Sequence, residues 1–384
     1  MLLPIANIPR AYSWGSLALI AELEGREPSG APEAEIWYGD HPGGPSHVLG
    51  AAGQTLDAAL AAAGEPPLPF LLKLLAAGSS LSIQAHPTKA EAVEGFAREE
   101  RAGIPRDAPE RLYRDANHKP EIIVALSDQF CALVGLRPVP ETLRLISALG
   151  GGPALAHLGA LLADPDEHKG LRAALAWALS EASAADVAEL TAALESAAAG
   201  EAGFGPEVAV LRAAASDFPG DRGLFVALLM NLVILRRGEG LFAPAGVLHA
   251  YQSGLGVELM AASDNVLRGG LTPKHVDVPE LLRVLDATPG PAPLVETHEV
   301  AGVVVYDVAI PDFSLARVEL SGSDVPVELR GPAIALATAG DPVVTQGERR
   351  VALAPGQAVY VGGGAAGLVL TGVGQVFVAQ PGIA

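Results

Sequence analysis

The chain has 384 residues; half are hydrophobic, 18% are charged, and the formal net charge is −19. This composition is typical of a globular protein and excludes a largely disordered one. Because so acidic a surface repels the phosphates of nucleic acids, we expect no nucleic-acid partner. An anionic substrate would need lysine and arginine side chains gathered locally, against the charge of the whole molecule.

The cysteine content and the apolar runs indicate the cellular compartment of the protein. Cys131 is the only cysteine, so no intrachain disulfide can form, which suits a reducing compartment. The first 15 residues lack the basic start and the unbroken apolar core of a signal peptide. The longest apolar candidate, residues 223–235, is shorter than the roughly 18 residues of a membrane-spanning helix. We therefore expect a cytoplasmic protein with no membrane partner.

The first two thirds of the chain contain two kinds of sequence. Residues 1–137 mix short apolar runs with proline- and glycine-rich turns, which predicts strands. Residues 138–235 are rich in alanine and leucine at helical spacing. Within them, the segments 154–164, 171–183 and 184–200 predict amphipathic helices.

The remaining chain is rich in valine and glycine, and the segments 303–310, 342–346 and 358–362 predict strands. One helical signal interrupts it, because the capping residue Asp277 is followed by an acid three positions later. No histidine occurs after His298, so a final β-domain has little means of binding a transition metal. The order of strands, helices and strands predicts a mainly β fold with an α-helical lobe, of the sandwich or jelly-roll kind.

Two short segments carry side chains suited to a metal ion. In LSIQAHP, Gln84 and His86 are two positions apart, so on a strand they project to the same face. In HKPEIIVAL, Glu121 stands directly before an apolar run, and a carboxylate buried there needs a cation as its partner. Each signal alone is weak, since a lone buried histidine or a solvated strand end has the same appearance.

A third segment, GEGLFAPAGVLH, is more specific. It fits the spacing of the second cupin motif at four fixed positions: Gly238, Pro244, Gly246 and His249. Pro244 and Gly246 turn the chain between two strands, and His249 then returns toward the barrel interior. Together the three segments supply two imidazoles, one carboxylate and one amide oxygen. This set predicts a zinc site with room for a substrate, although iron, manganese and cobalt stay open.

Longer stretches resemble the type I mannose-6-phosphate isomerase family. The similarity covers most of residues 1–290 in the same order and lies in YSWG (12–15), IWYGDHPGGPS (36–46), SIQAHP (82–87), HKPE (118–121), LLMNLVILRRGEGLFAPAGVLHAY (228–251) and VELMAASDNVLRGGLTPKHVDV (257–278). The resemblance implies interconversion of mannose 6-phosphate and fructose 6-phosphate through an enediol(ate). It also implies one zinc ion per chain, held by Gln84, His86, Glu121 and His249.

The same resemblance implies two cupin (jelly-roll) domains with a helical domain inserted into the first. The expected divisions are a catalytic cupin domain in two parts, 1–137 and 236–294, a helical domain, 138–235, and a C-terminal cupin-like domain without a metal site, 295–384. We expect a monomer whose partner is a small sugar phosphate.

Isomerisation requires a base for the carbon-bound proton and a cation for the developing oxyanion. Arg268 falls where the family carries an arginine implicated in catalysis, and its permanent charge suits stabilisation of an enediolate or phosphate. Lys119 and Glu258 are the candidate proton carriers, with a metal-bound water as a third. The sequence does not choose between them.

The candidates for the substrate phosphate are Lys73, Lys274 and Arg268, with Ser82 offering a hydroxyl group. Lys73 lies in an apolar run, where an unpaired ammonium is costly, so we expect it to face the cavity. Trp14 is a candidate for the cavity wall.

Two other functions compete with this one. An iron-dependent cupin oxygenase would be favoured by three histidines plus a glutamate, a set that the sequence does not show. A non-catalytic sugar-binding cupin would need neither the full ligand set nor Arg268.

Overall fold

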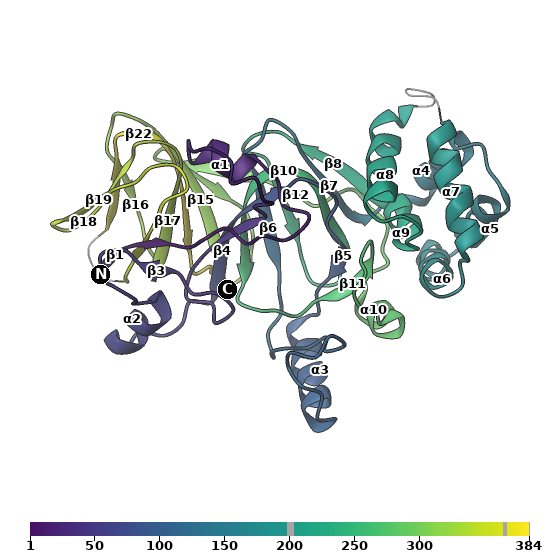
Figure 1. The fold of residues 1–384 in the computed structure, drawn as a ribbon, viewed down its shortest axis with the longest axis horizontal. Helices are drawn as coiled ribbons and strands as arrows, with labels where there is room; N and C mark the ends of the chain where they lie inside the picture. The colour runs from purple at the N-terminus through teal and green to yellow at the C-terminus, as the bar shows by residue number, and fades with distance from the viewer. Residues whose placement is uncertain (198–202, 364–366, 384) are drawn as a thin grey trace.

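The computed structural model describes residues 1–197, 203–363 and 367–383 of the chain. Three regions follow one another along the long axis of the molecule (Figure 1): a C-terminal β region, a central β region and a lobe of helices. The mainly β fold with an α-helical lobe, predicted from the sequence, is confirmed. Among the described residues, no helix is long and apolar enough to cross a membrane.

The central region is a network of strands from distant parts of the chain. Its members are β2 (Glu35–Tyr38), β4 (Phe70–Ala77), β5 (Ile83–Ala85), β6 (Glu121–Ala125), β7 (Phe130–Leu136), β8 (Met230–Leu235), β9 (Gly240–Ala243), β10 (His249–Ala261), β11 (Leu267–Gly270) and β12 (Leu294–Val295). Every pairing among them is antiparallel. Strands from before and after the helical lobe therefore interleave in one structure.

The long strand β10 joins the two sheets of this region. Residues 249–253 pair with β5 and β7, and residues 254–261 pair with β4 and β6. The change occurs at Gly254, whose φ of 115° is unfavourable for other residues, and a Cβ there would lie 2.9 Å from the ring of Phe130. A strand that bends from one sheet into the other is how sandwiches make their corners. It brings side chains of both sheets to one interior.

The helical lobe consists of α4 (Val139–Ala148), α5 (Pro153–Leu162), α6 (Glu167–Ser180), α7 (Ala184–Ser196), α8 (Gly205–Asp217) and α9 (Gly223–Leu229). The three predicted helices correspond to α5, α6 and α7 and are confirmed, although residues 198–200 lie outside the described part of the chain. Their leucines form one apolar cluster with residues of β7 and α9. The lobe is thus packed directly onto the central region.

The end of the range predicted as helical is different. Residues 230–235 form the strand β8, which pairs with β7 from Leu136↔Met230 to Phe130↔Leu235. The run MNLVIL is short and apolar, and periodicity alone does not separate a short buried strand from a helix. Pairing with β7 makes this segment a strand.

The structure also contains helices in the range for which the sequence predicted strands. These are α1 (Leu19–Leu23), α2 (Leu56–Ala63) and α3 (Lys89–Arg101). The start of α3 carries a capping box, with reciprocal bonds between Thr88 and Glu91, and this pattern was available in the sequence. The helix predicted after Asp277 is confirmed as α10 (Val278–Val284), and the Asp277 carboxylate accepts from the Glu280 N–H at 2.9 Å.

The C-terminal region consists of two sheets. They contain β13 (Thr297–Val300), β14 (Val303–Tyr306), β15 (Ser314–Ser321), β16 (Val325–Val327), β17 (Ala333–Gly340), β18 (Val343–Gln346), β19 (Arg349–Ala352), β20 (Ala358–Val361), β21 (Leu368–Thr371) and β22 (Val373–Gln380). The three strands predicted here fall on β14, β18 and β20; β14 is shorter than predicted.

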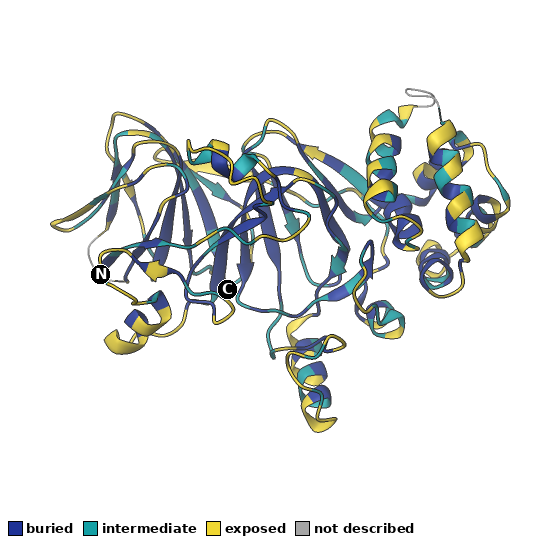
Figure 2. Cartoon of the chain, in the orientation of Figure 1, coloured by how far each residue is buried: buried dark blue, intermediate teal, exposed yellow. Residues whose placement is uncertain are grey.

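Two strands from the start of the chain belong to this C-terminal sheet. β1 (Leu2–Ala6) pairs with β20, and β3 (His47–Val48) pairs with β1. The sequence grouped both with the first β-domain, because nothing local to a strand states which distant edge it completes. Buried aromatic side chains such as Phe70 and Phe377 share one apolar cluster, so the two β regions share a core, seen as the dark interior strands in Figure 2.

Candidate metal centre and active-site cavity

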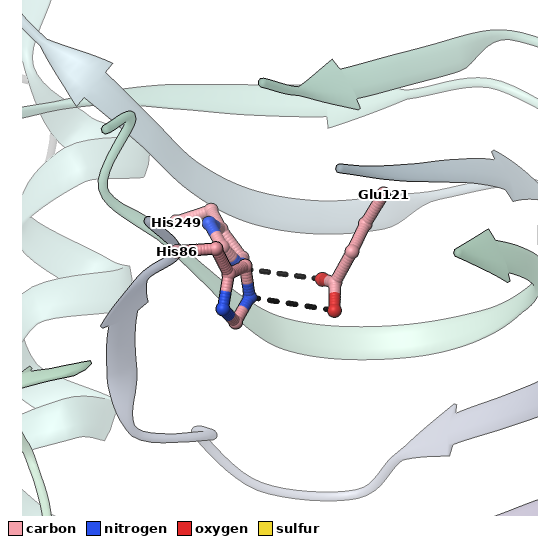
Figure 3. Close-up of side chains that lie close together, drawn as sticks. All are labelled: His86, Glu121 and His249. Atoms are coloured by element: carbon pink, nitrogen blue, oxygen red, sulfur yellow. Dashed lines mark ion pairs between the residues drawn. The ribbon is translucent and has the colours of Figure 1, made fainter. Parts of the chain in front are cut away.

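Two histidines and one glutamate meet in the interior of the central region. His86 follows β5, Glu121 begins β6 and His249 begins β10, and all three are buried. Nε2 of His86 lies 3.4 Å from Oε1 of Glu121, and Nε2 of His249 lies 3.2 Å from Oε2 of the same carboxylate (Figure 3). Among the described residues, no other group of three potential ligands lies so close together.

Both imidazole rings are oriented by backbone carbonyl groups. Nδ1 of His86 lies 2.7 Å from the carbonyl oxygen of Asn265, and Nδ1 of His249 lies 3.0 Å from that of Val247. Because a carbonyl oxygen only accepts, each Nδ1 carries the proton and each Nε2 has its lone pair directed toward Glu121. Nε2 of His86 is buried without a hydrogen-bond partner. Such an arrangement of electron pairs fits a bound cation.

The charges around the cluster favour the ligand forms of these residues. Burial lowers the pKa of His86 to about 4, and Lys119 adds to the effect, so the ring is neutral at physiological pH. Burial alone would raise the pKa of Glu121, but the positive charge of Lys119 holds it well below its usual range. The Lys119 ammonium forms an ion pair with Glu121, with 2.9 Å between Nζ and Oε1. Neutral imidazoles and an ionised carboxylate are the forms that bind zinc.

Gln84 is the fourth member of the donor set predicted from the sequence. It is the direct neighbour of His249 on β10 and of Arg268 on β11, and directly opposite residues of paired strands leave the same face of a sheet. Its amide nitrogen donates to Oγ of Ser82 at 3.0 Å, so its amide oxygen is the atom available to a metal.

A cavity of about 720 Å³ lies in front of this cluster. Apart from His86, all the site residues predicted from the sequence line it: Trp14, Lys73, Ser82, Gln84, Lys119, Glu121, His249, Glu258, Arg268 and Lys274. The structure therefore brings together side chains from five strands and several loops. A volume of this size suits a small organic ligand.

The position of Lys73 within the cavity changes its expected role. Its ammonium lies 2.9 Å from Oε2 of Glu258 and 3.5 Å from Oε1 of Glu35. Although burial opposes the charged form, these carboxylates raise the pKa of Lys73 above its usual range. The two carboxylates already compensate the positive charge of the Lys73 ammonium. This arrangement therefore disfavours the contact with the substrate phosphate that the sequence led us to expect.

The cavity also contains a second set of cations, Arg114, Arg268 and Lys274, which form no ion pair with a carboxylate among the described residues. Burial and the nearby Arg114 lower the pKa of Arg268. Partial burial, together with Arg268 and Arg114, lowers the pKa of Lys274. The three cations therefore act on one another, and an anionic ligand would relieve their repulsion. Sequence reasoning missed Arg114, because an arginine in the loop RLYRDANHKPE carries no periodic or motif signal.

Two further cavity residues were also missed. Glu35 and Trp37 both lie on β2; the Trp37 indole donates to Oε2 of Glu35 at 2.8 Å, and Trp37 is directly opposite Lys73 in the sheet. Glu35 is one of the two carboxylates that hold Lys73. The alternation of β2 was a possible signal, but only its pairing with β4 shows which side faces the cavity.

The two-sheet β region, its buried histidine–carboxylate cluster and the cation-lined cavity define a metal-dependent enzyme of the cupin class. Residues 2–139 match the model of the family described as phosphomannose isomerase type I, catalytic domain. The chain is 36% identical to the mannose-6-phosphate isomerase of Escherichia coli K12 over 391 residues, covering 97% of each. It is 32% identical to the human mannose-6-phosphate isomerase, covering 83% of this chain and 82% of the human one.

Solved structures agree with these matches over the whole chain. The structure of mannose 6-phosphate isomerase from Salmonella typhimurium, bound to fructose 6-phosphate and zinc, aligns with a TM-score of 0.89 at 32% identity and covers 100% of both chains. This chain belongs to the type I phosphomannose isomerase family, and it is an enzyme of the isomerase class.

Proposed function

We propose that this chain interconverts mannose 6-phosphate and fructose 6-phosphate in the cavity described above, with one zinc ion per chain. The observation that carries the proposal is that one cavity contains both a candidate metal site and a candidate phosphate site. The buried cluster of His86, Glu121 and His249 adjoins this cavity, and Arg114, Arg268 and Lys274, which pair with no carboxylate among the described residues, line its wall. A sugar phosphate has a carbonyl end for the first and a dianionic end for the second.

The zinc ligands are Gln84, His86, Glu121 and His249. Their donor atoms are one amide oxygen, one carboxylate and two imidazole nitrogens, all of which zinc accepts. When bound, zinc supplies Lewis-acid polarisation of the substrate's carbonyl and hydroxyl oxygens. Lys119 holds the carboxylate of Glu121 in place through its 2.9 Å ion pair. Ser82 accepts from the amide nitrogen of Gln84, which directs the amide oxygen toward the centre.

Arg114, Arg268 and Lys274 bind the phosphate group. Support comes from their shared cavity wall and from the mutual lowering of the pKa values of Arg268 and Lys274. Arginine suits this task because its planar guanidinium donates two parallel hydrogen bonds to phosphate oxygens. Arg268 also lies beside Gln84 in the sheet, so it is placed to stabilise negative charge on the reacting end of a bound sugar.

Glu258 is the proton carrier. It takes the proton from C2 of the aldose and delivers it to C1, while the proton of the C2 hydroxyl passes to O1. Burial raises the pKa of Glu258, although Lys73 opposes the shift, and a raised carboxyl pKa favours a residue that both accepts and returns a proton. Lys119 is the second candidate for the proton carrier. We rank it behind Glu258, because its ammonium group forms an ion pair with the proposed metal ligand Glu121.

The choice between these two carriers has a direct test. Glu258→Gln keeps the shape of the side chain but removes its basicity, so kcat should fall by about 10²- to 10⁴-fold with zinc still bound. Lys119→Met should instead weaken zinc binding, because it removes the partner of Glu121. A Glu258→Gln enzyme with normal kcat would exclude Glu258 as the proton carrier and leave Lys119 and a metal-bound water as the candidates.

The predicted domains have separate tasks in this proposal. The catalytic cupin domain, predicted as 1–137 and 236–294 and including the strand β8 (Met230–Leu235) in the structure, supplies the metal centre. The helical lobe, residues 139–229, adds Asp217 and Phe218 to the cavity wall. Trp14 extends the wall beside Tyr12, with ring centroids 5.7 Å apart. The C-terminal domain (295–384) stabilises the fold through the shared core.

The decisive experiment measures isomerase activity on mannose 6-phosphate by coupled detection of fructose 6-phosphate. The enzyme is assayed as purified, after removal of metal by a chelator, and after restoration with zinc. Activity lost with the metal and regained with zinc supports the proposal. No turnover by a zinc-loaded preparation would refute it, and recovery with iron alone together with oxygen consumption would favour the oxygenase.

The enzyme is proposed to act as a monomer in the cytoplasm. Support for the monomer is that one chain supplies every side chain assigned above to the metal, the phosphate and the proton. Light scattering after size-exclusion chromatography checks this, and a mass of two or more chains at the working concentration would contradict it.

A further inference from the structure

Asn265 lies between the metal centre and the cavity cations. It is completely buried in the segment that joins β10 to β11. Its backbone carbonyl oxygen is the group that accepts from Nδ1 of His86 at 2.7 Å. The position of this single carbonyl therefore decides which nitrogen of the His86 ring is free to bind a metal and where that nitrogen points.

The side chain of Asn265 binds the backbone of the loop of residues 114–117. Its Oδ1 accepts from the N–H groups of Arg114 at 2.7 Å and Asp115 at 3.2 Å. Its Nδ2 donates to the carbonyl oxygens of Asp115 at 2.9 Å and Asn117 at 2.8 Å. The Nδ2 group also donates to Oδ1 of Asp115 at 3.3 Å, so every bond of the amide goes to this one loop and four of the five go to main-chain atoms. Only a side chain with both a donor and an acceptor can make this set.

The loop of residues 114–117 also forms hydrogen bonds of its own to residues 263 and 264, which directly precede Asn265. The carboxylate of Asp115 accepts from Oγ of Ser263 at 2.9 Å and from the N–H of Asp264 at 2.8 Å. The N–H of Asn265 in turn donates to Oγ of Ser263 at 3.2 Å. The two segments are thus held together by a closed set of bonds, and neither moves without the other.

These segments carry different parts of the proposed active site. The first contains Arg114 and leads, through His118 and Lys119, to the metal ligand Glu121. The second leads to Arg268, two residues after Val266, which itself lines the cavity. A displacement of Asn265 would shift both cations and the ring of His86 together.

We infer that Asn265 is a positioning residue that couples the metal centre to the phosphate-binding cations, through its carbonyl on His86 and its amide on the loop of Arg114. This inference rests on the proposed function for the identity of the metal and substrate. It concerns a residue that need not touch either of them. Its effect is expected on zinc affinity and on KM at the same time, because one residue holds both parts, with its backbone carbonyl on His86 and its side-chain amide on the loop of Arg114.

The test replaces the amide by a carboxylate of the same shape, Asn265→Asp. The carboxylate keeps the two acceptor contacts but cannot donate, so the carbonyl oxygens of Asp115 and Asn117 lose the Nδ2 donor and face a negative charge. Zinc affinity, measured by competition with a chromogenic chelator, should fall about 10- to 100-fold, as for other residues that orient a ligand. KM for mannose 6-phosphate, measured with saturating zinc, should rise as well.

A matched control makes the same chemical change in the C-terminal region. Gln380 is buried, its Oε1 accepts from the N–H of Arg330 at 2.8 Å, and its Nε2 donates to the carbonyl oxygen of Glu328 at 3.3 Å. Gln380→Glu should lower the melting temperature and leave zinc affinity and KM unchanged. Asn265→Asp with a lowered melting temperature but unchanged zinc affinity and KM would reduce Asn265 to a structural role and overturn the inference.

A milder variant keeps the test usable if Asn265→Asp does not fold. Ser263→Ala removes one bond to Asp115 and the acceptor of the Asn265 N–H, so a smaller loss of zinc affinity and a smaller rise in KM are expected together. Zinc affinity and KM both within twofold of the parent enzyme would overturn the inference. Zinc binding that depends on Asn265, in a protein without isomerase activity, would refute the proposed function and leave the coupling to the metal intact.

Discussion

The central and C-terminal β regions have related architecture but different interiors. In the central region, ionisable side chains such as Lys73, Glu121 and Glu258 are buried around a cavity of about 720 Å³. In the C-terminal region, the space between the sheets is filled by small and medium apolar side chains, among them Val318, Leu370 and Val376. The central β region therefore encloses a cavity lined by ionisable side chains, whereas the C-terminal β region encloses a packed apolar core.

The difference shows what a reactive interior requires. A buried charge is tolerated only with a partner, and the central region provides one for Lys73 and for Lys119. It leaves Nε2 of His86 without a hydrogen bond, and it leaves Arg268 and Lys274 near other cations. We expect the metal ion to bind at the free nitrogen of His86 and an anionic ligand to bind at the cations. Variants in the two regions should consequently fail in different ways.

The largest effect is expected at the metal centre. His249→Ala removes one of the two proposed imidazole ligands, so bound zinc measured by elemental analysis should fall from about one per chain toward zero, and activity should disappear with it. His298→Ala, which alters an exposed histidine paired with Asp307 in the C-terminal region, is the control and should keep its zinc. Undiminished zinc in His249→Ala would remove this residue from the ligand set.

The next effect concerns catalysis without loss of metal. Arg268→Ala should lower kcat by about 10²- to 10³-fold, as expected for loss of a group that stabilises developing negative charge. Zinc content should be unchanged, because the guanidinium is not a ligand. Steady-state kinetics with parallel metal analysis checks both. A near-normal kcat with a raised KM would restrict Arg268 to binding the phosphate.

A stability effect is expected in the C-terminal region. Leu370 on β21 is completely buried, so Leu370→Ala should lower the free energy of unfolding by about 2–5 kcal/mol through lost burial and the cavity left behind. Denaturant unfolding measures the change. Zinc content and kcat of the folded fraction should equal those of the parent enzyme. A loss of zinc in this variant would show that the two regions are not separable in function.

The smallest effect is a pH dependence. Because partial burial, Arg268 and Arg114 lower the pKa of Lys274, this lysine loses its charge at a lower pH than a free lysine. As pH rises through that value, KM for the sugar phosphate should rise by about two- to fivefold, the range expected for one partly exposed ion pair. Lys274→Arg keeps the charge and should flatten the profile. An identical rise in both enzymes would assign the pH dependence to another group.

Much of the fold was accessible from local sequence. The helices α5, α6 and α7 and the cap of α10 follow from apolar periodicity and from capping residues, which act within a few positions. The strand β8 and the place of β1 in the C-terminal sheet did not follow. Both depend on which edge lies beside them, and a short apolar run carries no record of its neighbour.

The sequence by itself determined the kinds of donor atoms and their order: the two histidines, the glutamate and the glutamine stand in short motifs whose spacing restricts their orientation. Tertiary structure alone decided which charges are paired. It placed Lys73 between Glu258 and Glu35 and brought Arg114 to Arg268. The physical reason is that pairing depends on distances across strands and loops far apart in the chain, whereas a motif records only the residues next to one another.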